Sequence, residues 1–290
     1  MALDFTDKVA VVTGAGGGLG RSHALALAAR GAKVVVNDLG GSVSGEGESV
    51  DHAQKVVDEI VAAGGEAIAN TASVSDPAGA QSMIDDAMNH FGGIHILINN
   101  AGILRDQSFK NANMDDMKLV LDVHLMGSVY TTKAAWQIMC DQQYGRIVMT
   151  TSPSGLFGNF GQTNYGAAKL GIVGLMNTLA IEGQKKNVFC NAIAPVALTR
   201  MTEGLMPQLD DGAKAKLAPE WVTAAVLNLC TEGTQNGDII LTNGPGYKLV
   251  RYCQNAGVKL GETGTAEDLE QVWDQLMDMS DVTVRAKRAG

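Results

Sequence analysis

The chain of 290 residues contains little proline and cysteine and has no surplus of basic residues. Only six prolines are present, which argues against a proline-rich linker between separate domains. The formal net charge of −9 argues against a nucleic-acid partner, because a phosphate backbone attracts Lys and Arg. The four cysteines are widely spaced and form no CxxC pair. This spacing favours reduced, mostly buried thiols over a metal site.

Long apolar runs are also missing. No stretch reaches the length of a transmembrane helix, and no basic segment leads into an apolar run at the N-terminus. The last three residues, Arg-Ala-Gly, match neither a peroxisomal nor a retention signal. We therefore expect a cytoplasmic protein without a membrane partner. The hydrophobic content of 46% is enough for one substantial core.

Short β-branched runs alternate with longer amphipathic stretches through most of the chain. Strands are predicted at residues 9–13, 33–37, 67–71, 94–98, 146–151, 188–193 and 238–241. Helices are predicted at residues 19–30, 50–63, 77–91, 117–142 and 165–182. This alternation is typical of an α/β fold with a doubly wound parallel sheet, whose ligands bind beyond the carboxyl ends of the strands.

The alternation stops after Val250. We therefore divide the chain into a domain at residues 1–250 and a C-terminal helical tail at residues 251–290. One helix is predicted in the tail, at residues 265–279. We expect the tail to pack on the same domain.

A glycine-rich segment, TGAGGGLG at residues 13–20, follows the first predicted strand and opens the first predicted helix. In that context Gly14 allows a tight turn, Gly18 lets the backbone approach a pyrophosphate, and Gly20 lets helix and strand pack closely. The helix N-terminus offers free N–H groups to phosphates. The segment predicts a dinucleotide site, and a merely flexible loop is the alternative.

Asp38 ends the second predicted strand, where the acid that binds the adenosine ribose is expected. Its carboxylate would repel the extra phosphate of NADP, and the neighbours Leu39, Gly40 and Gly41 could not bind that phosphate. NAD is therefore the predicted cofactor. A turn or capping aspartate is the alternative.

Tyr165 and Lys169 are four residues apart, which places both side chains on one face of a helix. A tyrosine with its ordinary pKa near 10 is a poor base at neutral pH, but a nearby ammonium and a positive nicotinamide ring both lower that pKa. Tyr165 could then accept the proton of an alcohol while hydride leaves. The alternative is a packed tyrosine beside a surface lysine.

Two further polar turns follow predicted strands. Ser152 comes directly after the strand at residues 146–151, so its hydroxyl could reach the substrate oxygen beside the tyrosine. The turn Asn99–Gly102 follows the strand at residues 94–98 and could lie close to the cofactor. Each is also compatible with an ordinary polar turn.

Taken together, these motifs resemble the short-chain dehydrogenase/reductase family: TGAGGGLG, NNAG at 99–102, Ser152, YGAAK at 165–169 and NAIAP at 191–195. The resemblance covers about Phe5 to Leu249. It implies a Rossmann sheet of about seven strands, with Ser152, Tyr165 and Lys169 as the catalytic residues. The cofactor residues that it implies are Gly14, Gly18, Leu19, Gly20, Asp38, Ser73, Val74, Asn100, Ala101, Tyr165, Lys169, Pro195, Ala197 and Thr199.

The sequence departs from the family pattern at three places. His124 stands where most of the family has the Asn of a proton relay, and a packed core histidine is the alternative. Ser73 stands where many relatives have an Asp beside the adenine, which weakens that contact. Val196 stands where glycine usually follows Pro195.

Longer motifs, such as NDLGG at 37–41 and GNFGQTNYGAAKLG at 158–171, resemble the (3R)-hydroxyacyl-CoA dehydrogenase units of the multifunctional type 2 enzymes. These units are also described as 17β-hydroxysteroid dehydrogenases. The resemblance implies oxidation of the 3-hydroxyl of a (3R)-3-hydroxyacyl-CoA by a stand-alone dehydrogenase.

Two alternatives remain open. One is a 17β-hydroxysteroid dehydrogenase of the estradiol-to-estrone type, whose apolar cleft could be lined by Leu156, Phe157, Phe160, Leu205 and Met206. The other is a non-catalytic NAD-binding scaffold. The resemblance also implies a homodimer or homotetramer formed through the helices at residues 117–142 and 165–182.

Overall fold

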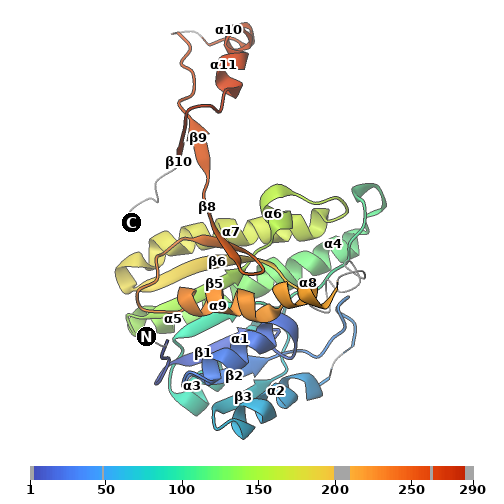
Figure 1. Cartoon of the computed structure of the whole chain (residues 1–290), viewed down its shortest axis with the longest axis vertical. Coiled ribbons are helices and arrows are strands. Elements are labelled where there is room, and N and C mark those ends of the chain that lie inside the picture. The colour runs from blue at the N-terminus through green and yellow to red at the C-terminus, as the bar shows by residue number, and fades with distance from the viewer. Residues whose placement is uncertain (1–2, 48, 199–209, 262–263, 285–290) are drawn as a thin grey trace.

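The computed structural model describes residues 3–47, 49–198, 210–261 and 264–284. Its central sheet has eight strands in the order β3-β2-β1-β4-β5-β6-β7-β8 (Figure 1). The strands are β1 (Val9–Thr13), β2 (Lys33–Asn37), β3 (Glu66–Asn70), β4 (Ile96–Asn99), β5 (Gly145–Thr150), β6 (Val188–Val196), β7 (Ile239–Asn243) and β8 (Gly246–Val250). β1 to β7 run parallel, and β8 pairs antiparallel with β7.

The doubly wound parallel sheet predicted from the sequence is confirmed, with one strand more than expected. β8 returns along β7 after the turn at Gly244, whose φ of +56° suits glycine. Four of the five residues of β8 are exposed. The strand therefore lacks the apolar alternation by which the other strands could be recognised.

Helices cover both faces of the sheet (Figure 1). They are α1 (Gly18–Ala28), α2 (Asp51–Ala62), α3 (Pro77–Phe91), α4 (Met114–Leu121), α5 (Gly127–Asp141), α6 (Pro153–Phe157), α7 (Thr163–Gly183), α8 (Asp211–Lys216) and α9 (Pro219–Leu229). α1, α2 and α9 share one hydrophobic core, and α3, α5 and α7 share another. Alternate residues of β1 enter the two cores, because successive side chains of a strand point to opposite faces. Among the described residues, no helix is both long and apolar enough to cross a membrane.

β1 is the point at which the strand order reverses. It pairs with β2 on one side and with β4 on the other. In open α/β sheets the crevice at such a switch point, beyond the carboxyl ends of the strands, is where ligands bind. The fold therefore directs attention to the residues that follow β1, β2 and β4.

The single helix predicted at residues 117–142 is interrupted in the structure. α4 and α5 are separated by a π-helical turn at Asp122–Met126, which contains the buried His124. The Ser128 hydroxyl donates a hydrogen bond to the His124 carbonyl at 2.7 Å. π-helical turns inside α-helices often mark functional sites, and this one lies next to the tyrosine described below.

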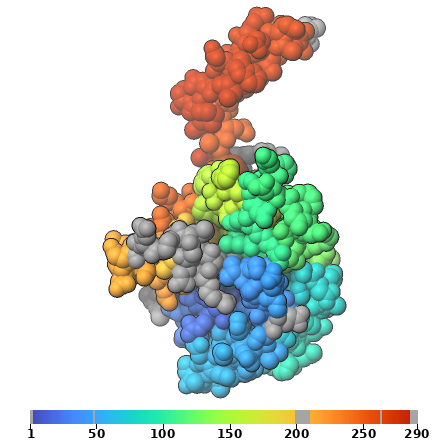
Figure 2. Space-filling model, turned by 90° about the vertical axis from the view of Figure 1, so that its right-hand side faces the viewer, coloured from blue at the N-terminus to red at the C-terminus, as the bar shows by residue number. Residues whose placement is uncertain are grey.

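The tail contains the strands β9 (Cys253–Asn255) and β10 (Val282–Val284), which pair antiparallel, and the helices α10 (Ala266–Gln271) and α11 (Trp273–Met277). The helix predicted at residues 265–279 is thus two short helices. Figures 1 and 2 show the tail standing away from the domain, and none of its described residues is buried. This arrangement differs from the expected packing on the same domain.

The four cysteines differ in exposure. Cys253 in the tail is exposed and Cys140 is partly exposed, whereas Cys190 and Cys230 are buried.

Candidate active site

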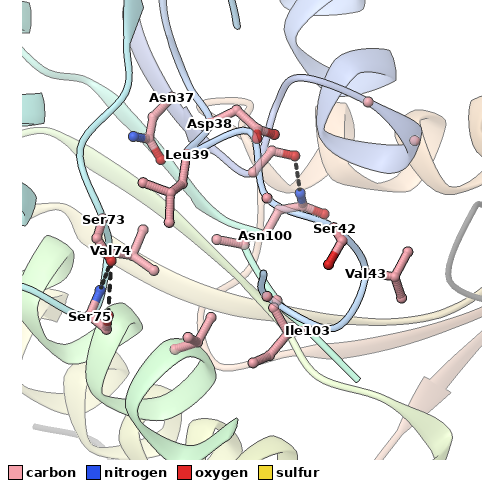
Figure 3. A pocket seen from close by; sticks show the side chains of 18 of the residues that line it. Asn37, Asp38, Leu39, Ser42, Val43, Ser73, Val74, Ser75, Asn100 and Ile103 are labelled. Atoms are coloured by element: carbon pink, nitrogen blue, oxygen red, sulfur yellow. Dashed lines mark hydrogen bonds between the residues drawn. The ribbon is translucent and has the colours of Figure 1, made fainter. Parts of the chain in front are cut away.

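A pocket lies at the carboxyl ends of β1, β2 and β4 (Figure 3). It is lined by eight of the residues proposed for the cofactor: Gly14, Gly18, Leu19, Asp38, Ser73, Val74, Asn100 and Ala101. Gly20 lies directly behind the glycine turn. Tyr165, Lys169, Pro195 and Ala197 are not part of this lining, and Thr199 lies outside the described residues.

The glycine turn between β1 and α1 approaches the turn after β4 very closely. Gly14 has a φ of +61°, and a Cβ placed on it would lie 2.7 Å from Cα of Ala101. Gly18 has a φ of +52° and begins α1, and a Cβ on Gly20 would overlap the Gly14 carbonyl oxygen. The backbone conformation therefore favours glycine at positions 14 and 18, and close approach requires it at positions 14 and 20. The approach of Gly18 to a pyrophosphate stays a prediction.

Asn100 fixes this approach by hydrogen bonds. Its Nδ2 donates to the carbonyl oxygens of Thr13 and Gly14, both at 3.0 Å. In turn, the Thr13 hydroxyl accepts from the backbone N–H groups of Asn100 and Ala101 at 3.0 and 3.1 Å. Sequence reasoning missed Thr13, although its place directly before the glycine turn was a usable signal.

Asp38 lies between the glycine turn and the loop after β2. Its Oδ2 accepts from the Gly16 N–H at 2.8 Å, and its Oδ1 accepts from the Gly40 N–H at 2.7 Å. The carboxylate therefore lies at the pocket wall and also fixes a turn, so both interpretations of this residue are compatible with the structure. Its binding to ribose stays a prediction.

The segment after β3 closes the far side of the pocket. The Ser73 hydroxyl lies 2.9 Å from that of Ser75, and Val74 is buried next to Gly127. The buried Asn37, which sequence reasoning missed, holds this segment by donating to the Ala72 carbonyl at 2.9 Å. A polar residue at the end of an apolar strand was the signal for it.

Ser152, Tyr165 and Lys169 come together at the carboxyl end of β5. Ser152 is the N-cap of α6, and its hydroxyl accepts from the Ser154 N–H at 3.1 Å. The Lys169 Nζ lies 5.4 Å from the Tyr165 ring centre and donates to the Thr150 carbonyl at 2.7 Å. The helical spacing of Tyr165 and Lys169 on α7 thus places both beside the strand that ends at the serine.

The protein environment shifts the pKa values of Tyr165 and Lys169 in opposite directions. Burial raises the pKa of Tyr165 to about 12, and the neighbouring Ser152 hydroxyl offsets only part of this. Burial also lowers the pKa of Lys169 to about 7. The expected lowering of the tyrosine pKa is therefore not produced by the side chains of this chain alone, because the loss of hydration outweighs the hydrogen bond to Ser152.

Replacing Lys169 by methionine should change how stability depends on pH. The folded-state pKa is about 7 and the ordinary value is 10.5, so between these pH values the unfolded chain binds more protons. Wild-type stability should therefore gain from rising pH in this window, and Lys169→Met should lack that gain. Urea unfolding of both proteins at pH 6.5 and pH 9 measures this. The free energy of unfolding of the variant, minus that of the wild type, should be more favourable to the variant at pH 6.5 than at pH 9. An equal difference at both pH values would contradict the buried lysine.

His124 contacts both Tyr165 and the turn after β4. Its ring meets Tyr165 edge-on at 5.2 Å between centres, and its Nε2 lies 3.0 and 2.8 Å from the N and O of Ile103. Burial, with a smaller contribution from Lys169, keeps its pKa well below the ordinary range. The imidazole is therefore neutral, and its Nδ1 is buried without a hydrogen-bond partner.

The start of α7 is tied to the segment after Ile103. Asn164 donates from Nδ2 to the Arg105 carbonyl at 2.8 Å, and Gln162 donates from Nε2 to Asp106 at 2.6 Å. Sequence reasoning missed both residues, because their partners lie more than 50 residues away. Pro195 lies near the end of β6, whose Ile193 is paired with Thr150 of β5. Within the described residues, no group of three His, Cys, Asp or Glu side chains could hold a metal ion.

Comparisons with known proteins agree with this geometry. The family model for short chain dehydrogenases matches residues 8–210. Peroxisomal multifunctional enzyme A of Dictyostelium discoideum is 48% identical over 95% of this chain, which spans 61% of that enzyme. A putative short-chain type dehydrogenase/reductase of Mycobacterium tuberculosis is 47% identical and is covered to 95%, and a hydroxyacyl-CoA dehydrogenase of the same organism is 38% identical and is covered to 80%. These two matches cover 94% and 85% of this chain.

Solved structures show the same relationship. Full-length peroxisomal multifunctional enzyme type 2 of Drosophila melanogaster has a TM-score of 0.82 at 40% identity, over 98% of this chain and 48% of that one. A 7α-hydroxysteroid dehydrogenase complexed with NADH and a 7-oxo bile acid has a TM-score of 0.73 at 27% identity, over 84% of this chain and 95% of that one. The family match, the relatives and the fold agree, and this chain belongs to the short-chain dehydrogenase/reductase family of oxidoreductases that act on secondary alcohols.

Proposed function

We propose that the chain oxidises the 3-hydroxyl of a (3R)-3-hydroxyacyl-CoA to the ketone with NAD. The main observation is the convergence of Ser152, Tyr165 and Lys169 at the end of β5, beside a pocket built as a dinucleotide site. The names of the relatives support this substrate class, since one is a hydroxyacyl-CoA dehydrogenase. Several relatives are multifunctional enzymes longer than this chain, so the proposal concerns only the dehydrogenase reaction.

The pocket suits a nicotinamide dinucleotide, and NAD is the form that we propose. Glycines with positive φ at positions 14 and 18 leave room where side chains would obstruct a pyrophosphate. Asp38 places a carboxylate in the pocket wall, where we propose that it binds the adenosine ribose. No Lys or Arg is among the described residues that line it, so the charge-assisted hydrogen bonds that favour the extra phosphate of NADP are missing there.

Each of the three side chains has its own role in the proposed reaction. Bound NAD supplies the hydride acceptor. The Ser152 hydroxyl holds the substrate oxygen, and Tyr165 takes the hydroxyl proton. In this proposal Lys169 holds the cofactor ribose, and its ammonium form and the positive charge of the bound cofactor both favour the tyrosine phenolate.

NADH formation with (3R)-3-hydroxyacyl-CoA, its (3S) epimer and estradiol tests the proposal in one assay. We expect the (3R) thioester to have the highest kcat/KM by at least about 100-fold, because a wrongly placed hydroxyl cannot reach both Ser152 and Tyr165. Equal rates for the two epimers would contradict the stereochemistry. No oxidation of any secondary alcohol, together with tight NAD binding, would favour the non-catalytic scaffold.

A 17β-hydroxysteroid dehydrogenase is the second candidate. It is favoured by the likeness to a solved hydroxysteroid dehydrogenase and by apolar side chains that follow Ser152. Phe157 and Phe160 are 70% and 89% exposed, so an apolar ligand has surface to cover there. Leu205 and Met206 lie outside the described residues. A higher kcat/KM for estradiol than for the thioester would establish this candidate.

We also propose a homodimer or homotetramer formed through α5 and α7. Leu170 is 46% exposed on α7, and Gly174 has no atom near its Cβ position, so a second helix could approach closely. Light scattering at micromolar concentration should give at least twice the chain mass of 30.3 kDa. Leu170→Glu should lower that mass, and a monomer in the wild type would contradict the proposal.

A cytoplasmic location stays a prediction, since the names of several relatives place them in peroxisomes.

A further inference from the structure

The Gly/Ser-rich segment at residues 39–47, here termed the cofactor loop, forms one wall of the pocket (Figure 3). Leu39, Gly41, Ser42, Val43 and Gly45 line it. The loop is folded on itself, because the Ser42 N–H donates to the Glu46 carbonyl at 2.8 Å and the Gly45 N–H to the Ser42 carbonyl at 2.9 Å. It therefore has a defined shape of its own.

Arg105 holds the cofactor loop from outside the pocket. Its Nε donates to the Ser44 carbonyl at 2.9 Å, and its Nη2 lies 3.5 Å from the Glu46 carboxylate. Its Nη1 donates to Asp116 of α4 at 2.6 Å. Next to it, the Leu104 N–H donates to the Val43 carbonyl at 3.0 Å. One planar guanidinium thus joins the loop to α4, a geometry that the point charge of lysine cannot reproduce.

The same short segment reaches the catalytic helix. The Arg105 carbonyl accepts from Asn164, the residue before Tyr165. The Ile103 side chain lies against Gly45, 3.2 Å from where a Cβ would stand on that glycine. Residues 103–105 therefore contact the cofactor loop on one side and the start of α7 on the other.

These contacts hold the cofactor loop in position. A loop containing Gly40, Gly45 and Gly47 loses much conformational entropy when it is ordered, so its position depends on bonds to the rest of the protein. The charge-assisted bonds of Arg105 are the strongest type available to it. Asp116 aligns the guanidinium, and the side chains of Arg105 and Asp116 are both about three-quarters buried.

We propose that Arg105 is a positioning residue that latches the cofactor loop over bound NAD and so slows release of the cofactor. The inference rests on the proposed dinucleotide site. It assigns to Arg105 a role in cofactor retention, without contact with the reacting atoms. Asp116 supports the latch by holding the guanidinium in place, and the longer contact to Glu46 contributes less.

The latch is tested by the rate of NADH dissociation, followed by fluorescence after displacement with excess NAD. Arg105→Gln should raise this rate about tenfold, because it removes charge-assisted hydrogen bonds to the loop. Arg105→Lys should restore little of it, and Asp116→Asn should give a smaller rise. Lys110→Gln removes one exposed positive charge nearby and should change nothing.

A second measurement needs no cofactor. Amide hydrogen exchange across residues 40–47 of the unliganded protein should be faster in Arg105→Gln than in the wild type or in Lys110→Gln. Unchanged exchange and an unchanged NADH dissociation rate would overturn the latch. If the wild type fails to bind NADH, the proposed function is wrong, whereas loop exchange still decides whether Arg105 holds the loop.

Discussion

Replacing Tyr165 by phenylalanine should lower kcat at least about 100-fold, because general acid–base catalysis by one positioned group contributes roughly 10²- to 10⁴-fold. The substitution removes only the hydroxyl. The ring, its edge-on contact with His124 and the packing of α7 should therefore remain. The Kd for NADH should change less than about threefold, since the cofactor pocket is lined by other residues.

The pH at which the Tyr165 hydroxyl ionises distinguishes a role as the catalytic base from a purely structural role. Burial raises the pKa of Tyr165 to about 12 in the chain alone, so the unliganded protein should show no phenolate absorbance from this residue below about pH 11. Difference spectra at pH 9 should show phenolate appearing when NAD is added to the wild type and not to Tyr165→Phe. Substantial turnover by the phenylalanine variant would exclude the tyrosine as the base.

Replacing Asp38 by asparagine should raise the Kd for NAD by about 10- to 150-fold, the loss expected for a hydrogen bond to a charged group. The same change should strengthen NADP binding, because it removes a carboxylate that repels the extra phosphate. Titration of NADH and NADPH fluorescence measures both constants.

The opposite response of the two cofactors matters because Asp38 also holds the backbone. Its two oxygens accept from Gly16 and Gly40, and an asparagine amide has only one oxygen to offer. A purely structural loss would weaken NADH and NADPH binding together. Equal weakening, with a lower melting temperature, would therefore leave Asp38 as a turn residue without a role in specificity.

Elements whose signals were local could be predicted from the sequence closely. The β-branched run of β1 and the Asp76–Pro77 start of α3 gave the observed ends, since the Asp76 carboxylate caps the Ala78 and Gly79 N–H groups. The placing of Gly14, Gly18 and Asp38 around one pocket could be predicted for the same reason, because a turn and the strands beside it determine their surroundings.

Features that depend on distant residues could not be predicted. Most residues of β8 are exposed, so its sequence shows no alternation of apolar and polar residues. Its position in the sheet follows only from pairing with β7. The π-helical turn around His124 has no sequence signature, because its side-chain contacts are to Ile103 and Tyr165. The raised pKa of Tyr165 follows from burial, which spacing along a helix does not reveal. The role of Arg105 requires three segments to be seen together.

The close packing of His124 against Gly102 has an evolutionary consequence. A Cβ on Gly102 would overlap the imidazole ring. A mutation at position 102 to any larger residue is therefore tolerated only after position 124 has acquired a smaller one, whereas position 124 can shrink first at the cost of a cavity. The order in which the two mutations arise is thus constrained, and a lineage that keeps the histidine also keeps the glycine.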